Sequence, residues 1–259
     1  MAEIFKENAQ VMKQECIGTG IYSMWLKTEK IAGAARPGQF VSVYCTDGSR
    51  LLPRPISICE IGEDKKSLRL VYRVAGKGTG EFAKAKAGDV FQVLGPLGNG
   101  FPLERCQEGK TAFLIGGGIG IPPMLELSKQ LKGNKMAVLG YRDERFLDGE
   151  LSNYADVYIA TEDGSMGTKG NVLDAIKAHG LKADVIFACG PTPMLRALKA
   201  YAEEEGIECW LSLEERMACG VGACLGCVCH SKEIDDHSKV HNKRVCKDGP
   251  VFSSTEVVL

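Results

Sequence analysis

Short apolar runs divided by glycine, proline and charged residues fill the first hundred positions of the chain. Six of these runs carry the β-branched and aromatic residues typical of strands, and they lie at 10–17, 21–27, 40–44, 56–60, 68–74 and 90–94. Turn signals stand between them, such as RPG at 36–38 and DG at 47–48. The pattern predicts a six-stranded antiparallel barrel as a first domain over residues 1–104. A short helix over 80–85, capped by Thr79, is expected to interrupt it.

From about Lys110 the pattern changes to apolar strands that alternate with helices. Strands are predicted at 111–115, 136–141, 156–160 and 184–188, and helices at 122–131, 172–178 and 193–204. Alternation of this kind predicts a parallel sheet covered by helices on both faces. We therefore expect a second, α/β domain over residues 105–210.

Two tight turns follow strands of the predicted α/β domain. GGGIG at 116–120 ends the first strand, and CGPTPM at 189–194 ends the last. The carboxyl ends of parallel strands share one edge of a sheet, so both turns should face one crevice, where doubly wound folds bind dinucleotides. The first turn is not a full G-x-G-x-x-G because of Ile121, and glycine-rich turns also occur for packing alone. The candidate nucleotide-binding residues are Gly116, Gly117, Gly118, Gly120, Cys189, Gly190, Pro191 and Met194.

A cluster of cysteines dominates the remaining stretch, residues 211–259. Cys219, Cys224 and Cys227 have the spacing C-x4-C-x2-C, and Cys246 can complete a tetrad, with Cys229 as a spectator. This is the spacing of plant-type [2Fe–2S] ferredoxins, whose cluster is held by four thiolates. Glycines between the cysteines let the backbone curl and direct N–H groups toward the sulfurs. A small [2Fe–2S] domain is therefore expected.

Zinc is the alternative occupant of these cysteines. Structural zinc sites commonly carry two close cysteine pairs or a Cys/His tetrad. Only one C-x2-C pair is present, although His230, His237 or His241 could supply a ligand. Covalent haem attachment is excluded, because Val228 rather than histidine follows the C-x2-C pair.

The charge, the apolar runs and the cysteine content of the chain limit the partners and the cellular location that we expect. The 259 residues carry a formal net charge of −1, which argues against nucleic acid or an anionic membrane as the main partner. No apolar run approaches the roughly 20 residues that span a bilayer, and the polar N-terminus lacks a signal-peptide core. With eleven cysteines and no secretion signal, we expect reduced thiols and a cytoplasmic location.

Three places in the predicted barrel suit a flavin nucleotide. RPIS at 54–57 offers a guanidinium for a pyrophosphate and a hydroxyl for a ring nitrogen. VYR at 71–73 adds an aromatic ring and a second guanidinium, and GT at 78–79 opens a helix whose N–H groups favour phosphate. An edge strand that begins with proline would also explain RPIS. The flavin prediction therefore depends on the three motifs occurring together in one barrel. The candidate residues are Arg54, Pro55, Ile56, Ser57, Val71, Tyr72, Arg73, Gly78 and Thr79.

Together these motifs resemble the ferredoxin–NADP reductase superfamily, in which a flavin-binding barrel precedes a nucleotide domain with GGGxG and CGPxxM. More closely, nearly the whole chain resembles the electron-transfer subunits of dihydroorotate dehydrogenase B. The matching segments are RPISI at 54–58, YR at 72–73, GTG at 78–80, LGPLGNGFP at 94–102, GGGIGIPP at 116–123, CGPTPML at 189–195, SLEERMACGVGACLGCVCH at 212–230 and CKDGPVF at 246–252.

The resemblance implies an oxidoreductase subunit with FAD on the barrel, NAD(H) on the two turns and a [2Fe–2S] cluster on the four cysteines. A flavin converts hydride into single electrons, so no catalytic side chain is required. The implied partner is an FMN-containing catalytic subunit that oxidises dihydroorotate to orotate in pyrimidine biosynthesis. The implied assembly is a heterotetramer with two subunits of each kind.

Three questions stay open at the level of sequence. The superfamily usually has tyrosine where Ile56 stands, so another side chain, such as Tyr72, would have to cover the flavin ring. Arg142 could bind the 2′-phosphate of NADPH and Asp143 the 2′-hydroxyl of NADH, and the family favours NADH. The alternative functions are a reductase subunit of a ferredoxin:NADP, sulfide dehydrogenase or hydrogenase complex, and a redox-sensing module without catalysis.

Overall fold

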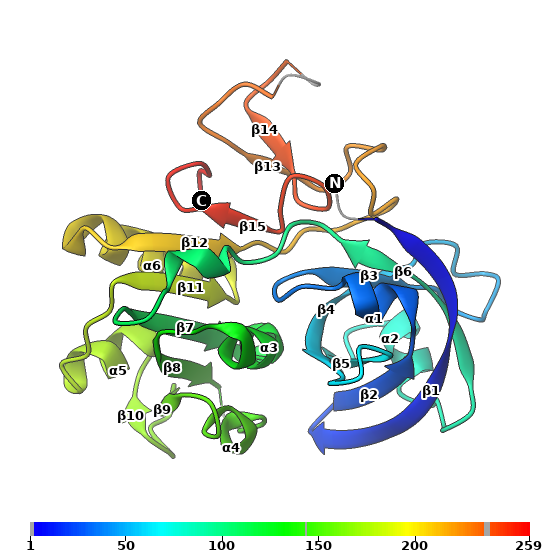
Figure 1. The fold of residues 1–259 in the computed structure, drawn as a ribbon, viewed down its shortest axis with the longest axis horizontal. Coiled ribbons are helices and arrows are strands. Elements are labelled where there is room, and N and C mark those ends of the chain that lie inside the picture. The colour runs from blue at the N-terminus through cyan, green and yellow to red at the C-terminus, as the bar shows by residue number, and fades with distance from the viewer. Residues whose placement is uncertain (1–2, 143, 236–238) are drawn as a thin grey trace.

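The computed structural model of the chain describes residues 3–142, 144–235 and 239–259, so the roles considered for Asp143 and His237 fall outside the described residues. Figure 1 shows a barrel, a sheet flanked by helices, and a smaller part, above them in this view, that contains β13 and β14. Among the described residues, no helix combines the length and the apolar character needed to cross a bilayer.

Six antiparallel strands close the barrel in the order β1-β2-β5-β4-β3-β6. Their bounds are β1 (Phe5–Gly18), β2 (Ile21–Lys27), β3 (Phe40–Val43), β4 (Arg54–Ile61), β5 (Ser67–Arg73) and β6 (Val90–Leu97). Apolar side chains from all six strands pack inside it, among them Met24, Val41 and Leu70. The predicted six-stranded antiparallel barrel is confirmed, and β1 is longer than its apolar run indicated because its polar residues face solvent.

The short helix of the barrel begins earlier than predicted. α2 spans Lys77–Phe82 with Gly76 at its N-cap, so Thr79 lies inside the first turn. The Thr79 hydroxyl accepts hydrogen bonds from the N–H groups of Ala75 and Gly76, at 2.9 and 3.2 Å. The predicted cap was wrong, because the threonine satisfies these N–H groups from within the helix. A second short helix, α1 (Lys30–Ala34), was not predicted.

The α/β part contains a seven-stranded sheet of order β10-β9-β8-β7-β11-β12-β15. Its strands are β7 (Thr111–Gly117), β8 (Asn134–Tyr141), β9 (Asp156–Thr161), β10 (Thr168–Lys169), β11 (Val185–Cys189), β12 (Glu208–Ser212) and β15 (Val251–Ser253). Every neighbouring pair is parallel except β12 with β15. Because the chain proceeds outward from β7 to β10 and then outward on the other side from β11 to β12, the topological switch point lies between β7 and β11. Doubly wound folds bind their ligands at this point.

Helices cover both faces of this sheet, as predicted. They are α3 (Pro122–Gln130), α4 (Asp148–Leu151), α5 (Val172–Ala178) and α6 (Thr192–Glu205), with 3₁₀ turns η1 (Leu103–Arg105) and η2 (Gly118–Gly120). α3 and α4 share a core with Leu114 of β7 and with barrel residues. α5 and α6 share the opposite core with Phe113. Adjacent side chains of β7 thus point into two different cores, as expected for a strand that is buried on both faces of the sheet.

The cysteine region is an excursion between two neighbouring strands of the sheet. β12 and β15 pair in antiparallel register with Ser212 opposite Val251, and the N–H of Leu213 donates to the carbonyl of Pro250 at 2.9 Å. Residues 213–235 and 239–250 therefore belong to a long hairpin, the cluster hairpin. Its neck, residues 213–217 together with 250, is closed beside the sheet. Inside it, β13 (Val228–His230) pairs with β14 (Asn242–Arg244), two strands that were not predicted.

A partly buried charge network joins the barrel to the α/β part. Arg69 of β5 binds the carboxylates of Glu60 on β4, at 3.3 Å, and of Glu150 on α4. Lys129 of α3 binds Glu60 at 3.0 Å. Glu126 of α3 accepts a hydrogen bond from a backbone N–H of β4 at 2.8 Å. These contacts hold the two parts in one orientation.

Candidate functional site

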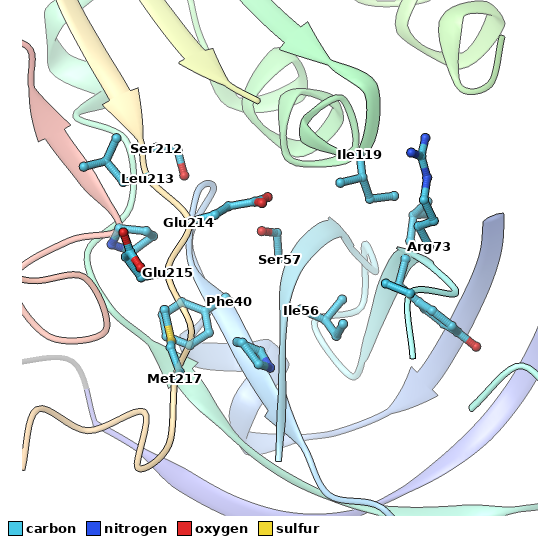
Figure 2. A pocket seen from close by; sticks show the side chains of 15 residues that line it. Phe40, Ile56, Ser57, Arg73, Ile119, Ser212, Leu213, Glu214, Glu215 and Met217 are labelled. Atoms are coloured by element: carbon cyan, nitrogen blue, oxygen red, sulfur yellow. The ribbon is translucent and has the colours of Figure 1, made fainter. Parts of the chain in front are cut away.

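A pocket of about 290 Å³ opens where all three parts of the molecule meet (Figure 2). Its walls come from β3, β4 and β5 of the barrel, from η2 after β7, and from the neck of the cluster hairpin. The predicted flavin residues that line it are Pro55, Ile56, Ser57, Val71, Tyr72 and Arg73. A mostly apolar pocket with a few polar groups suits a planar ring with heteroatoms at its edge.

Two polar side chains face each other across this pocket. Figure 2 shows the hydroxyl of Ser57, on β4, and the carboxylate of Glu214, at the hairpin neck, pointing toward one another. Solvent reaches Glu214 through the pocket, but protein surrounds it closely enough that burial raises the pKa of its carboxyl group. A carboxyl group in this state can hold a proton or donate a hydrogen bond to a bound ring.

Arg54 and Gly78 lie in direct contact beside the pocket. A Cβ at Gly78 would stand 2.3 Å from Nε of Arg54, so a side chain there would displace the guanidinium from this place. The first N–H groups of α2, including that of Thr79, begin at the same place. Two of the three predicted phosphate-binding features, the guanidinium and the helix start, are therefore brought together.

Ile56 rather than Tyr72 presents its side chain to the pocket. The Tyr72 hydroxyl donates to Oε1 of Gln14 at 2.9 Å, its ring stacks on Tyr22 with centroids 6.0 Å apart, and only 2% of the residue is exposed. Figure 2 shows Ile56 projecting into the cavity. The wall at this position is aliphatic, where the superfamily usually has an aromatic ring.

The two glycine turns pack against each other at the switch point. Cys189 of β11 is the register partner of Gly116 of β7. A Cβ at Gly120 would stand 2.2 Å from the carbonyl oxygen of Cys189, and one at Gly117 would stand 2.7 Å from the sulfur of Met194. A side chain at Gly120 would meet fixed backbone, and one at Gly117 would displace Met194, so the two turns share one closely packed crevice.

The rest of the predicted nucleotide residues complete this crevice. A Cβ at Gly190 would lie 2.5 Å from Cε of Met194, and Pro191 is the N-cap residue of α6. From the barrel, Nη2 of Arg73 comes within 4.0 Å of the Cβ position of Gly118. Cys189 is completely buried, and burial raises the pKa of its thiol to about 12, so it acts here by packing and not as a nucleophile.

The four predicted cluster ligands form two pairs. A hydrogen bond from Cys246 lowers the pKa of Cys227 to about 6. Burial opposes the change at Cys219, but the N–H of Val221 and the thiol of Cys224 lower its pKa to about 7. Two thiolates per iron suit a two-iron cluster, whereas zinc needs four donors around one centre. Within the ranges that the structure describes, no three His, Cys, Asp or Glu side chains converge on a single ion position.

Backbone N–H groups point at these sulfurs, as the glycine pattern predicted. Gly222 donates to Sγ of Cys246 at 3.1 Å, and two residues of the loop and Cys246 donate to the other three sulfurs at 3.4–3.5 Å. Such donors stabilise negative charge on a metal-bound sulfur. Cys229 differs from Cys219 and Cys227, because burial raises the pKa of its thiol to about 11. The Nδ1 of His241 is 3.0 Å from the carbonyl of Lys232 and is thereby engaged outside the thiol pairs.

Several pocket residues were not predicted. They come from β3 and from the neck of the cluster hairpin, and they include Phe40, Ser212, Glu214, Met217 and Pro250. Ser212 ends the last parallel strand, Glu214 and Met217 follow it before the first cysteine, and Pro250 lies opposite them at the end of the hairpin. Their place at the carboxyl edge of the sheet was the one signal that could have marked them.

Comparison with known proteins agrees with this geometry. The family model described as the iron-sulfur cluster binding domain of dihydroorotate dehydrogenase B matches residues 214–258. The electron transfer subunit of dihydroorotate dehydrogenase B (NAD(+)) from Bacillus mycoides (strain KBAB4) is 45% identical over 260 residues, which cover 98% of this chain and 99% of the relative. The chain belongs to this family. The subunit of the same name from Bacillus cereus (strain B4264) matches to the same extent.

Solved structures confirm the reductase fold of this family member. The NADH-dependent reduced ferredoxin-NADP oxidoreductase, studied for flavin-based electron bifurcation, superposes with a TM-score of 0.85 and 29% identity, covering 96% of this chain and 89% of that one. The ferredoxin reductase of carbazole 1,9a-dioxygenase shares the fold at a TM-score of 0.65 and 19% identity, over 79% of this chain and 67% of that one. The predicted fold class, the oxidoreductase class with its electron-transfer role, and the cofactor classes (flavin, iron–sulfur, NAD) are thereby confirmed.

Proposed function

We propose that this chain passes electrons between NAD(H), FAD and a [2Fe–2S] cluster, and that each cofactor is held by the residues predicted for it. The observation that carries the proposal is the shared pocket, because barrel, nucleotide crevice and hairpin neck all contribute walls to it. A ring bound there has the crevice on one side and the segments that lead to Cys219 and Cys246 on the other. We keep 1–104, 105–210 and 211–259 as the proposed domain limits.

FAD, when bound, accepts hydride and gives up single electrons, which is the chemistry needed between NADH and an iron–sulfur centre. The chain's residues would bind and orient it. Arg54 and the α2 N-terminus, with Gly78 and Thr79, would hold the pyrophosphate. Ser57 and Glu214 would hydrogen-bond the edge of the ring. Burial raises the pKa of the Glu214 carboxyl group, which makes this side chain easier to protonate than an ordinary glutamate.

NADH would lie on the crevice between the two glycine turns. The missing side chains at Gly117 and Gly120 allow the backbone to approach its pyrophosphate, and the N-terminal start of α6 after Pro191 supplies N–H groups. Arg73 lies between the crevice and the pocket, so its guanidinium would bind a phosphate of NADH or of FAD. The four cysteines Cys219, Cys224, Cys227 and Cys246 would hold the cluster.

The proposed partner is a catalytic subunit that contains FMN and oxidises dihydroorotate to orotate in pyrimidine biosynthesis, joined in a heterotetramer with two subunits of each kind. The names of the relatives support a complex of this type, because each is called the electron transfer subunit of dihydroorotate dehydrogenase B. In the expected direction, electrons leave dihydroorotate on the partner and reach NAD⁺ on this chain. A cytoplasmic location remains our expectation.

Anaerobic purification with its partner tests this assignment. The complex should contain FAD, FMN and two irons per cluster, and NADH should bleach both flavin and iron–sulfur absorbance in this chain alone. Dihydroorotate should do so only with the partner present. Dihydroorotate oxidation by this chain alone, or the absence of flavin from it, would contradict the proposal.

A second function is favoured by the similarity to the ferredoxin-NADP oxidoreductase, which covers nearly the whole chain. In that case the partner would exchange electrons with reduced ferredoxin. Assays of the complex with dihydroorotate and with reduced ferredoxin separate the two. A higher kcat/KM for NADPH than for NADH would also count against the first function.

A further inference from the structure

Asn99, in the loop that follows β6, makes three hydrogen bonds to consecutive carbonyl groups of the cluster hairpin. Its side-chain Nδ2 donates to the carbonyls of Lys247 and Asp248, at 3.2 and 2.9 Å. Its backbone N–H donates to the carbonyl of Gly249 at 2.6 Å. The segment so held begins immediately after the cluster ligand Cys246. One barrel residue therefore holds the chain that carries this cysteine.

The same contact reaches the pocket. Gly98 has φ +72, and a Cβ there would stand 2.5 Å from Cδ of Pro250 and 3.1 Å from Cε1 of Phe40. Pro250 and Phe40 both line the pocket assigned to the flavin ring. The barrel loop, the hairpin segment and the pocket wall thus form one tightly packed layer with no room for an added side chain.

The segment held by Asn99 is stiff on its cluster side. Arg244 binds the Asp248 carboxylate through Nε at 2.9 Å and Nη2 at 3.1 Å, and its Nη1 donates to the carbonyl of Gly222 at 3.4 Å. Gly222 in turn donates to the sulfur of Cys246. Displacement of residues 247–249 would therefore be transmitted to Cys246 and would not be absorbed by a loose loop.

We infer that Asn99 is a positioning residue for electron transfer between the flavin and the cluster, because it fixes the Cys246 segment against the wall of the flavin pocket. The inference rests on the proposed placement of FAD and of the cluster. No bond forms or breaks at Asn99. A hydride from NADH carries two electrons and one proton. The cluster would take one electron and pass it to the proposed partner before taking the second, and the proton would go to solvent. Asn99 would affect only the distance between the flavin and the cluster and the size of its fluctuations.

Two variants of the full, cofactor-loaded chain test this role. Asn99→Asp keeps the shape of the side chain but removes both amide donors, and Asn99→Leu removes polarity at similar volume. The matched controls are Asn153→Asp and Asn153→Leu, at an exposed asparagine after α4. Three quantities are measured anaerobically: FAD and iron content, the rate of flavin bleaching by NADH, and the rate of cluster reduction followed by its EPR signal. Amide hydrogen exchange of residues 246–250 is measured in the oxidised protein without NADH.

The Asn99 variants should keep both cofactors and stay within about twofold of the unmodified rate of flavin bleaching, while cluster reduction slows by about tenfold, the range typical for outer-shell changes at metal sites. Exchange at residues 246–250 should rise, and the Asn153 variants should change neither quantity. Faster exchange with unchanged cluster reduction would overturn the inference. A parallel loss of iron, flavin and both rates would also overturn it, because Asn99 would then be only a folding residue. Failure of the unmodified chain to bleach with NADH would instead refute the proposed function.

Discussion

The nucleotide crevice and the cluster hairpin are built in different ways. In the crevice, the backbone at Gly120 packs directly on the backbone of Cys189, the side chain of Met194 packs on Gly117, and the surrounding strands are fully buried. In the hairpin, the cysteines are arranged by N–H groups directed at sulfur. Cys227 and Cys246 reach the apolar core of the sheet, whereas Cys219 and Cys224 lie on a loop nearer the surface. The exposed apolar side chains of the hairpin are Val221, Leu225, Val228, Ile234 and Val240. Packing shapes the first region, and polar contacts around a metal site shape the second.

The difference indicates where each region draws its stability. The crevice belongs to a large core and should keep its form without ligand. Only the base of the hairpin enters that core, so its outer loop should depend on iron for its order, as small metal domains commonly do. Its exposed apolar side chains also offer a surface for the proposed partner subunit. The two regions should therefore respond separately to mutation.

Loss of a cluster ligand should have the largest effect. Cys227→Ser removes a buried thiol that we propose as a cluster ligand, so iron content should fall to a small fraction of its normal value and hydrogen exchange across the cluster hairpin should rise. FAD content and flavin bleaching by NADH should persist. Iron analysis measures the iron content, and hydrogen-exchange mass spectrometry measures the exchange across the cluster hairpin. Cys229→Ser is the control and should retain iron. Loss of FAD from the Cys227 variant would remove the contrast between the two regions.

A side chain added in the crevice should destabilise the other half of the molecule. Gly120→Ala places Cβ against the carbonyl oxygen of Cys189, and overpacking of this kind costs about 3 kcal/mol. Urea unfolding followed by far-UV circular dichroism gives the change in free energy of unfolding. Gly149→Ala, where an added Cβ meets nothing within 4 Å, is the matched control and should be neutral within about 0.5 kcal/mol. Equal effects at both glycines would disprove the packing argument.

The charge network between barrel and sheet should have an intermediate effect. Arg69→Met removes the guanidinium and leaves the Glu60 carboxylate short of a partner, which should reduce the free energy of unfolding by about 2 kcal/mol. The exposed pair of Lys13 with Glu15 supplies the control, because Lys13→Met should cost less than about 1 kcal/mol. Thermal unfolding of both variants compares them. An unchanged transition in the Arg69 variant would mean that apolar packing alone orients the two parts.

The smallest effect is expected from the pH dependence of Glu214. Its pKa is raised in the folded chain, so between pH 4.5 and that raised value the native state binds more protons than the unfolded state, and stability falls as pH rises. Glu214→Gln should remove this fall, by less than about 1 kcal/mol because solvent in the pocket screens the charge. Denaturant midpoints at a series of pH values above 4.5 test it. The same slope in both proteins would contradict the burial of this carboxyl group.

The sequence predicted the regions whose signals are local. The six barrel strands, both glycine turns and the cysteine spacing each depend on residues within a short stretch, and the structure contains them all. Glu214, Phe40 and Pro250 were missed because they meet only after β12, β3 and β15 come together, which no local pattern encodes. Thr79 was misplaced although its signal is local. A threonine suits both the N-cap and the third position of a helix, so its presence does not say at which residue the helix begins. Short strands such as β13 and β14 depend on their pairing more than on their own sequence.

The pairing of β12 with β15 places the entry and the exit of residues 213–250 side by side. A two-residue turn between Ser212 and Val251 would therefore bridge the gap and leave the sheet intact. A chain shortened in this way would keep its barrel and its nucleotide crevice, but it would lack the iron–sulfur cluster that transfers one electron at a time. The iron-binding stretch is in this sense an insertion between two strands of a reductase fold. A different insertion that also restored the pocket walls of Glu214, Met217 and Pro250 would direct the electrons to another acceptor.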